Sequence, residues 1–260
     1  MKNTTKLMKF ILIFGMIDIL LAGAVIYRNM ADRVETNAGA FQNTTETDNS
    51  RKNMETGEKS DQTTADGEKD MMPDGDTKKV ALTFDDGPHK KYTPQMLDML
   101  KEHDVKATFF ITGENAAASP KIVKRMQQEG HLIGNHTFHH TQLTGVNESV
   151  FKDEIVDTNQ TIRKITGCDT EFIRPPYGSW KKKFEKELNM IPVLWTVDTL
   201  DWNSKDVGSI VVRGTKNTKE NDIILMHDCY QTSVEAAGQI ITILKEQGYT
   251  FVTVDEILFD

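Results

Sequence analysis

The sequence has few cysteines and no excess of positive charge. Among its 260 residues there are two cysteines, and 39 acidic residues outnumber 31 basic ones, which gives a formal net charge of −8. This acidity argues against a nucleic-acid partner, because binding to phosphates needs a basic surface. No internal repeat is visible, and 38 % of the residues are apolar, enough for one good-sized folded domain with appendages.

The two cysteines, Cys168 and Cys229, are predicted to lie too far apart for a disulfide bond. Cys168 comes before a predicted strand that ends near Arg174, whereas Cys229 comes just after a predicted strand that ends at His227. If both strands run parallel, the thiols lie at opposite ends, ~15–20 Å apart at ~3.3 Å per residue, beyond the reach of a disulfide. We therefore expect two free thiols, with a metal role for Cys229 as the alternative.

The one apolar run of nearly membrane-spanning length lies at the N-terminus. Residues 10–27 are apolar except for Asp18, and this length is close to the ~20 residues that cross a bilayer. Three lysines precede the run: Lys2, Lys6 and Lys9. Positive charge on that side keeps the N-terminus in the cytoplasm and exports the rest of the chain. We expect residues 1–30 to be a signal anchor in the cell membrane. The small residues at 22–24 also fit a signal-peptide cleavage site, so secretion after cleavage is the alternative.

Residues 31–78 lack the apolar side chains that a folded domain needs. This segment carries 12 acidic and 6 basic residues and a single aromatic residue, Phe41. Such a composition cannot bury enough apolar surface to offset the entropy lost on folding. We predict a disordered acidic linker there, followed by one folded domain over residues 79–260.

Short apolar runs alternate with amphipathic stretches through residues 79–260. The runs predict buried strands, and the stretches predict helices over residues 93–102, 120–128, 150–165 and 233–247. Strands that are continuously apolar and alternate with helices indicate a parallel sheet covered on both faces. About seven such units imply an α/β barrel, in which residues at the carboxyl ends of the strands converge on one mouth.

A pair of carboxylates follows the first of these strands. The apolar run Val80–Leu82 leads into Thr83-Phe84-Asp85-Asp86-Gly87-Pro88, in which the glycine and proline end the strand. Adjacent residues on an extended chain point to opposite sides, so one carboxylate can bind a metal while the other serves as a base. Taken alone, the run also fits a solvated turn.

Two histidines supply what the carboxylates lack. His136 and His140 are spaced i and i+4, and on one turn of helix they face the same way and can bind one ion. Two imidazoles and one carboxylate leave coordination positions open, as a catalytic metal site requires. Paired histidines on a helix surface are common, so it is the combination with the carboxylates that indicates a metal centre.

Three further segments follow strand-like runs. Arg174-Pro175-Pro176-Tyr177-Gly178 comes after residues 171–173, Asp198–Trp202 comes after the apolar run 191–197, and residues 223–228 form a strand that ends in His227-Asp228. Each segment alone also fits a structural element: a proline-fixed turn, a capped loop, and a strand closed by a core histidine.

The five segments, in this order and each at the end of a strand, resemble the motifs of the polysaccharide deacetylases of carbohydrate esterase family 4, also called the NodB-homology domain. The resemblance covers roughly residues 79–260 and implies a distorted (β/α) barrel. By the family pattern, the metal ligands are Asp86, His136 and His140, and the catalytic base is Asp85, which Arg174 would keep ionised.

The resemblance also implies roles for the remaining motif positions. His227 would be the general acid, kept charged by Asp201, and the backbone N–H of Tyr177 would bind the oxyanion. Trp202 and Leu225 would line a pocket that fits an acetyl methyl group.

These roles predict a metal-dependent N-deacetylase acting on an acetylated amino sugar of a cell-surface polysaccharide. Peptidoglycan N-acetylglucosamine is the first expectation, because an anchor and a linker would hold the domain near the cell wall. The alternatives are an O-acetyl esterase acting on xylan, a deacetylase of chitin oligosaccharides or poly-N-acetylglucosamine, and a catalytically silent glycan-binding protein. The ligands suit zinc, and cobalt or nickel also fit. We expect a monomer, and we expect His139 to support the site or pack beside it rather than bind the metal.

Overall fold

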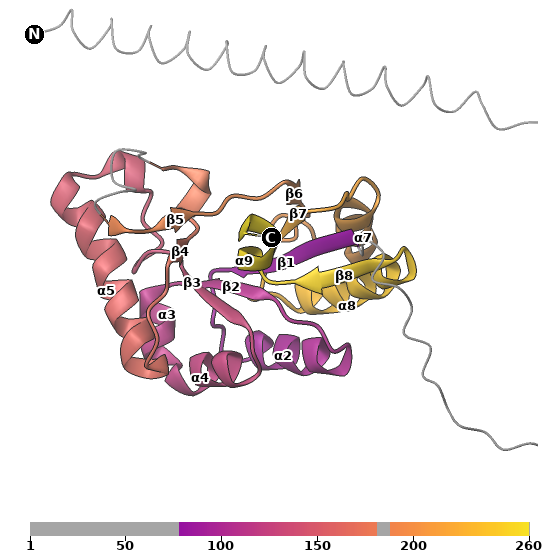
Figure 1. Cartoon of the computed structure of the whole chain (residues 1–260), viewed down its shortest axis with the longest axis horizontal. Coiled ribbons are helices and arrows are strands. Elements are labelled where there is room, and N and C mark those ends of the chain that lie inside the picture. The colour runs from indigo at the N-terminus through magenta and orange to yellow at the C-terminus, as the bar shows by residue number, and fades with distance from the viewer. Residues whose placement is uncertain (1–77, 181–187, 260) are drawn as a thin grey trace, which may run out of the picture. The chain divides into compact units, whose positions relative to one another are not determined.

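Eight strands form one parallel sheet in the part of the chain that this computed structural model describes, residues 78–180 and 188–259 (Figure 1). The strands are β1 (Lys78–Asp85), β2 (Thr108–Ile111), β3 (Leu132–Asn135), β4 (Phe172–Ile173), β5 (Ile191–Pro192), β6 (Val197–Asp198), β7 (Asp222–His227) and β8 (Tyr249–Val252). Their order in the sheet is β5-β4-β3-β2-β1-β7-β6, and β8 pairs with the first half of β1. Every strand pairing is parallel, so the prediction of a parallel α/β sheet of about seven strands is confirmed.

The sheet curves into an incomplete barrel, because its end strands β5 and β6 do not pair with each other among the described residues. The apolar run 191–197 was expected to be one strand, and this expectation is wrong. Pro192 has no N–H to donate to a neighbouring strand. The next two carbonyls, those of Val193 and Leu194, accept hydrogen bonds from the Arg174 guanidinium at 3.2 and 3.3 Å. The run therefore leaves the sheet after Pro192 and rejoins it as β6.

The alternating side chains of β1 divide the interior of the domain into two parts. Val80, Leu82 and Phe84 pack outward in the large apolar cluster beneath the helices. The residues between them face the inside of the barrel, where Ala81 lies in a second apolar cluster and Thr83 bonds to Arg174. This alternation is what a strand buried on both faces requires, and it directs Asp85 inward.

Seven helices in the described residues cover the sheet. They are α2 (Tyr92–Glu102), α3 (Gly113–Ala118), α4 (Pro120–Gln128), α5 (Glu148–Thr166), α7 (Val207–Thr215), α8 (Gln231–Glu246) and α9 (Val254–Phe259), with two short 3-10 turns at Leu143–Gly145 and Pro176–Gly178. The four helices predicted from the sequence are confirmed within two residues at each end. Helix α5 shows the local reasons: the Asn147 side chain accepts from the Val150 N–H at its start, and Gly167 ends it at φ 78°.

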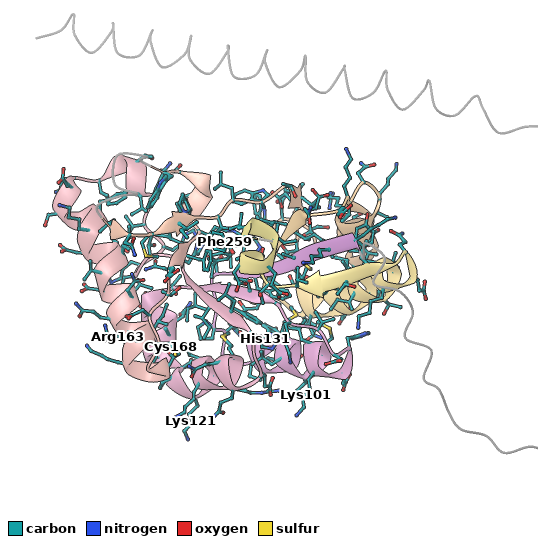
Figure 2. The ribbon with its side chains drawn as sticks, viewed as in Figure 1. Lys101, Lys121, His131, Arg163, Cys168 and Phe259 are labelled. Atoms are coloured by element: carbon teal, nitrogen blue, oxygen red, sulfur yellow. The ribbon has the colours of Figure 1, made fainter. Side chains whose placement is uncertain are left out.

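The C-terminal helix α9 closes the inside of the barrel at the amino ends of the strands. Val254 is fully buried in one cluster with Ala81, Phe172 and Ile223. Phe259, labelled in Figure 2, places its ring 6.1 Å from that of Phe172. With this end plugged, the opposite end, where the carboxyl ends of the strands meet, is the open one.

Both cysteines are free thiols, as predicted: Cys168 is exposed (Figure 2) and Cys229 is partly buried. The predicted signal anchor, residues 1–30, lies outside the described residues, as does the predicted linker up to residue 77. Within residues 78–180 and 188–259, no helix has both the length and the apolar character needed to cross a membrane.

Candidate metal centre and active-site pocket

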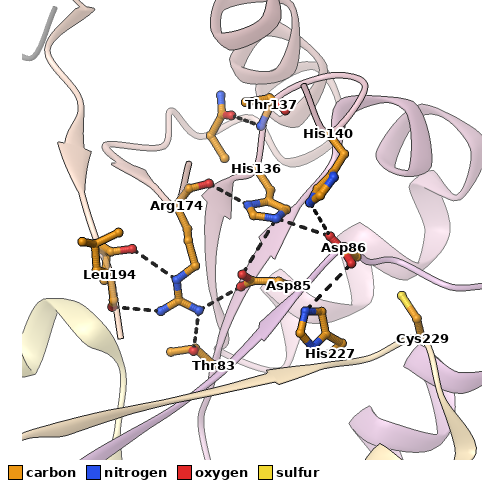
Figure 3. Close-up of polar contacts among 12 residues, drawn as sticks. Thr83, Asp85, Asp86, His136, Thr137, His140, Arg174, Leu194, His227 and Cys229 are labelled. Carbon is orange, nitrogen blue, oxygen red and sulfur yellow. Dashed lines mark hydrogen bonds and ion pairs between the residues drawn. The ribbon is translucent and has the colours of Figure 1, made fainter. Parts of the chain in front are cut away.

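Asp86, His136 and His140 meet at the carboxyl end of the sheet, although they come from two loops fifty residues apart in the sequence (Figure 3). Asp86 Oδ1 lies 3.3 Å from His136 Nε2 and 3.3 Å from His140 Nε2. One ligand atom from each residue lies within 4.8 Å of the other two. Two imidazoles and a carboxylate at this spacing can share one divalent cation and leave further coordination positions open.

The protonation of His136 suits it to bind a metal. Its Nδ1 lies 2.6 Å from the backbone carbonyl of Arg174, and because a carbonyl only accepts, Nδ1 must carry the proton. The lone pair is then on Nε2, which faces Asp86. On the other side of the cluster, Asp86 Oδ1 is buried and has no hydrogen-bond partner within the described residues. A buried oxygen without a donor fits a position beside a cation.

The electrostatics of the cluster favour metal binding at neutral pH. Burial raises the pKa of Asp86, but the neighbouring His136, His227 and His140 outweigh burial and lower it to about 2. Burial lowers the pKa of His140. The carboxylate is therefore ionised and this imidazole is neutral, which are the forms that bind a metal.

The two histidines lie in a loop after β3, and the prediction that they share a turn of helix is wrong. The loop includes left-handed backbone at Thr137 (φ 64°) and His140 (φ 57°), and this turns both rings toward Asp86. Glu154 of α5 holds the loop from behind. Its carboxylate accepts hydrogen bonds from the Phe138 and His139 N–H groups at 2.8 Å and contacts the His139 ring at 2.9 Å. His139 therefore bonds to Glu154, which agrees with the expectation that it supports the site rather than binds the metal.

Asp85 lies between Arg174 and the metal cluster: its Oδ1 is 2.8 Å from Arg174 Nη1, and its Oδ2 is 3.8 Å from His136 Nε2 (Figure 3). Arg174 Nη1 donates to Asp85 Oδ1 at 2.8 Å and to Thr83 Oγ1 at 2.6 Å. The guanidinium is fully buried and lies 4.3 Å from the centre of the Phe110 ring. With its donors bonded on several sides, Arg174 fixes the position of the Asp85 carboxylate.

His227, at the end of β7, pairs with the buried Asp201. Its Nδ1 lies 2.8 Å from Asp201 Oδ1, and its backbone N–H donates to Asp201 Oδ2 at 2.8 Å. Burial lowers the pKa of His227, but the hydrogen bond and charge of Asp201, helped by Asp85 and Asp86, raise it to about 9. His227 is therefore a charged imidazolium at neutral pH, and its free Nε2 lies 4.0 Å from Asp86 Oδ2.

These groups open into one pocket of about 350 Å³. It is lined by Asp85, Asp86, His136, His140, Pro175, Tyr177, Trp195, Asp198, Trp202, Leu225, His227 and Tyr230. Eight of the ten residues predicted for the site line this pocket, and the other two, Arg174 and Asp201, lie behind its wall. Cys229 is not part of the metal cluster: its thiol faces Asp228, and burial raises its pKa. A thiol that keeps its proton is a poor ligand.

Known proteins are similar to this chain in sequence and in fold. The sequence profile of the family described as polysaccharide deacetylase matches residues 73–193. A peptidoglycan-N-acetylglucosamine deacetylase of Bacillus cereus is 45 % identical over 181 residues, which are 67 % of this chain and 66 % of that relative. The peptidoglycan-N-acetylmuramic acid deacetylase PdaA of Bacillus subtilis is 40 % identical over 195 residues, 72 % of this chain and 74 % of the relative. The chain belongs to the polysaccharide deacetylase family.

A solved structure supports the same relationship. The structure of the peptidoglycan deacetylase PdaC from Bacillus subtilis matches with a TM-score of 0.68 and 39 % identity, over 70 % of this chain and 91 % of that one. The family predicted from the five motifs is thus confirmed. The chain spans 66 % of the Bacillus cereus relative, just under two thirds of its length.

Three buried polar residues that were not predicted from the sequence support the site. Glu154 is the easiest to recognise, because it is the one acidic residue on the buried face of α5. Asp228 follows His227 directly and accepts from Thr93 Oγ1 at 2.5 Å. A side chain at Gly87 would overlap the Asp228 carboxylate, with its Cβ 2.3 Å away. Ser233 carries no signal in the sequence, since a serine in the first turn of a helix is common.

Proposed function

We propose that this protein is a metal-dependent deacetylase that hydrolyses the N-acetyl group of an amino sugar in a cell-wall glycan and releases acetate. One observation carries the proposal. A possible metal cluster, a carboxylate held by a buried arginine, and a charged histidine held by an aspartate all line or support one pocket. Hydrolysis of an amide needs these three functions: electrophilic assistance, a base for water, and an acid for the leaving amine.

In this proposal Asp86, His136 and His140 hold the divalent metal. When bound, the metal would polarise the acetyl carbonyl and lower the pKa of the attacking water. Asp85 would accept a proton from that water, and Arg174 would keep its carboxylate in place. This division between the carboxylates is supported by their nearest partners. Asp85 bonds to the Arg174 guanidinium at 2.8 Å and lies 3.8 Å from His136 Nε2, whereas Asp86 lies 3.3 Å from the Nε2 atoms of both His136 and His140.

The leaving amine would take its proton from His227 Nε2 as the C–N bond breaks. The pKa of about 9 supports this role, because the imidazolium is then present throughout the neutral range. The N–H of Tyr177, which sits in left-handed backbone at φ 59°, would donate to the developing oxyanion. Trp202 and Leu225 would form the wall against the acetyl methyl group.

The substrate we propose is N-acetylglucosamine of peptidoglycan. Two observations support it: the Bacillus cereus relative carries that activity in its name, and the N-terminal sequence fits a membrane anchor. A flexible linker of ~48 residues has a root-mean-square reach of roughly 40 Å, which keeps the domain near the wall. The direct test is acetate release by residues 79–260 with added metal from peptidoglycan, chitin oligosaccharides, poly-N-acetylglucosamine and acetylated xylan. Faster release from xylan would favour the esterase alternative, and no release from any glycan with metal bound would favour a silent binder.

We propose zinc as the native metal, because two imidazoles and a carboxylate suit it. Cobalt and nickel tolerate the same ligands, so the apoprotein should be reconstituted with each metal at equal occupancy and assayed on the same glycan. Metal analysis of protein purified without added metal then identifies which ion the protein acquires.

We propose that the domain is a monomer, so residues 79–260 should have the mass of a monomer by light scattering.

We also propose that residues 1–30 anchor the protein in the cell membrane with the catalytic domain outside. Full-length protein should then fractionate with membranes and keep its first residues. A mature N-terminus near Val25 in the culture medium would instead show a cleaved, secreted enzyme. The proposed chemistry is the same in both cases, because no motif lies before Thr83.

A further inference from the structure

The His227–Asp201 pair has a third member, the buried Ser233. The Ser233 hydroxyl donates to Asp201 Oδ2 at 2.6 Å, and both residues are almost completely inaccessible to solvent (0 % and 2 % exposed). Asp201 thus accepts three hydrogen bonds: two from His227 itself, through its ring and its backbone N–H, and one from Ser233. Among the described residues, Ser233 is the one side chain outside the pair that bonds to the Asp201 carboxylate.

The helix that carries Ser233 affects how the Asp201 carboxylate and the His227 ring are oriented. Asp201 lies in the loop after β6, next to left-handed backbone at Leu200 (φ 52°), so its own segment is not a regular element. Ser233 lies in the first turn of α8, a helix of 16 residues with Ala236, Ala237 and Ile240 fully buried in the main apolar cluster. If His227 and Asp201 bonded only to each other, the carboxylate could turn together with the ring. The bond to α8 ties the carboxylate to the rigid core.

We propose that Ser233 is a positioning residue for proton donation: it orients the Asp201 carboxylate, which in turn directs His227 Nε2 into the pocket. This inference rests on the proposed role of His227 as general acid. In that step the Nε2 proton passes to the leaving nitrogen, which takes the electron pair of the breaking C–N bond. His227 is then neutral, and its remaining proton stays on Nδ1, hydrogen-bonded to Asp201. A small rotation of the ring would misplace Nε2 without removing any reacting group.

The inference predicts a selective defect in Ser233→Ala. Cleavage of an N-acetyl group needs a proton for the amine, whereas an aryl acetate ester has a leaving group that departs without one. We expect kcat for the N-acetyl glycan to fall about tenfold, part of the ~10²–10⁴-fold that a positioned acid contributes. We expect kcat for the aryl ester and KM for the glycan to stay within about twofold.

The chain offers a matched control in Ser209. It is also the third residue of a helix, α7, and its hydroxyl donates to the Asp206 carboxylate at 2.5 Å, but this pair is exposed and lies outside the pocket. Ser209→Ala removes the same kind of hydrogen bond and should change neither substrate's rate. Thermal unfolding of both variants reports any loss of folded protein. If Ser233→Ala does not fold, Ser233→Cys is tested instead, because its thiol has a similar size and is only a weak donor.

His227→Ala, measured alone and combined with Ser233→Ala, separates the possible outcomes. Selective loss in both single variants, with no further loss in the double variant, supports the positioning role. Equal loss of glycan and ester activity in Ser233→Ala, or no loss of either, overturns the inference about Ser233. If His227→Ala still loses glycan activity selectively, the assignment of His227 as the acid stands. If His227→Ala itself lowers both activities equally, the proposed acid role fails, and the inference about Ser233 fails with it.

Discussion

Arg174 reaches from the end of β4 to Asp85 at the end of β1, a partner 89 residues away in the sequence, and their side chains meet at 2.8 Å. The ion pair is buried on both sides, with Arg174 fully covered. Buried charges are stable only when they are paired and hydrogen-bonded. Here the guanidinium also donates to Thr83 and to the carbonyls of Val193 and Leu194, so one side chain ties β1 to the segment that follows β5.

The first prediction separates the two adjacent carboxylates. Asp85→Asn should keep the metal and lose hydrolysis, because it removes the proposed base and leaves the ligands intact. Asp86→Asn and His140→Ala should lose the metal itself, since each removes one of three ligand atoms. Metal content of the purified variants and their acetate release are the measurements. If Asp85→Asn loses the ion while Asp86→Asn retains it, the two roles are reversed.

A second prediction concerns pH. Asp201 raises the pKa of His227, so the imidazolium persists until the pH approaches about 9. Asp201→Asn removes the charge that opposes burial, and the pKa of His227 should fall. The alkaline limb of the kcat–pH profile on an N-acetyl substrate should therefore move to lower pH. Asp206→Asn, at an exposed aspartate outside the pocket, serves as the control. An unmoved or higher alkaline limb in Asp201→Asn would contradict the assignment.

Glu154 should determine how tightly the metal is held, although it does not touch the metal cluster. It fixes the loop that carries His136 and His140 by accepting from two backbone N–H groups of that loop. Loss of a supporting carboxylate around a metal site typically weakens affinity roughly 10–100-fold, and we expect this range for Glu154→Gln. Titration against a competing chelator measures it. Glu148→Gln on the same helix, where Glu148 pairs with Lys152, should bind metal like the wild type.

Asp228 should make the protein less stable as the pH rises. Burial raises its pKa in the folded protein to about 7, compared with 3.8 for a free side chain. The folded state therefore binds this proton more tightly than the unfolded state, and that contribution to stability is lost as the pH rises through about 7. Asp228→Asn has a similar shape and no charge, so it should be more stable than the wild type at pH 8 by about 1–4 kcal/mol.

Urea unfolding at pH 4 and pH 8 measures this difference directly. At pH 4 the wild-type carboxyl group is protonated in the folded protein, so the two proteins should have nearly equal stability. An advantage of Asp228→Asn that is the same at both pH values would show that packing, rather than ionisation, sets the difference. Asp98→Asn, at an exposed position on α2, gives the baseline for removing an acidic charge.

The sequence alone was enough to predict the family and the parallel α/β sheet. The sheet follows from local patterns, namely apolar runs ended by glycine and proline with polar residues just beyond them. The roles of the ten site residues follow from the resemblance of the five motifs to the family, and they stay predictions. Because the carboxyl ends of parallel strands share one edge, Asp85, Arg174 and His227 were expected to meet without any knowledge of the coordinates. These residues converge because all the strands are parallel, and the alternation of apolar runs with amphipathic stretches in the sequence predicts parallel strands.

Tertiary structure decided what the patterns left open. The spacing of His136 and His140 fits a helix, but left-handed backbone at Thr137 and His140 makes the segment a loop. Glu154 fixes that loop by accepting from two of its N–H groups. The run 191–197 is apolar enough for one strand, but Arg174 binds its carbonyls and divides it. In both cases a charged side chain from another part of the sequence bonds to the backbone of the segment. Local propensity does not contain such a partner, because the contact exists only once the chain has folded.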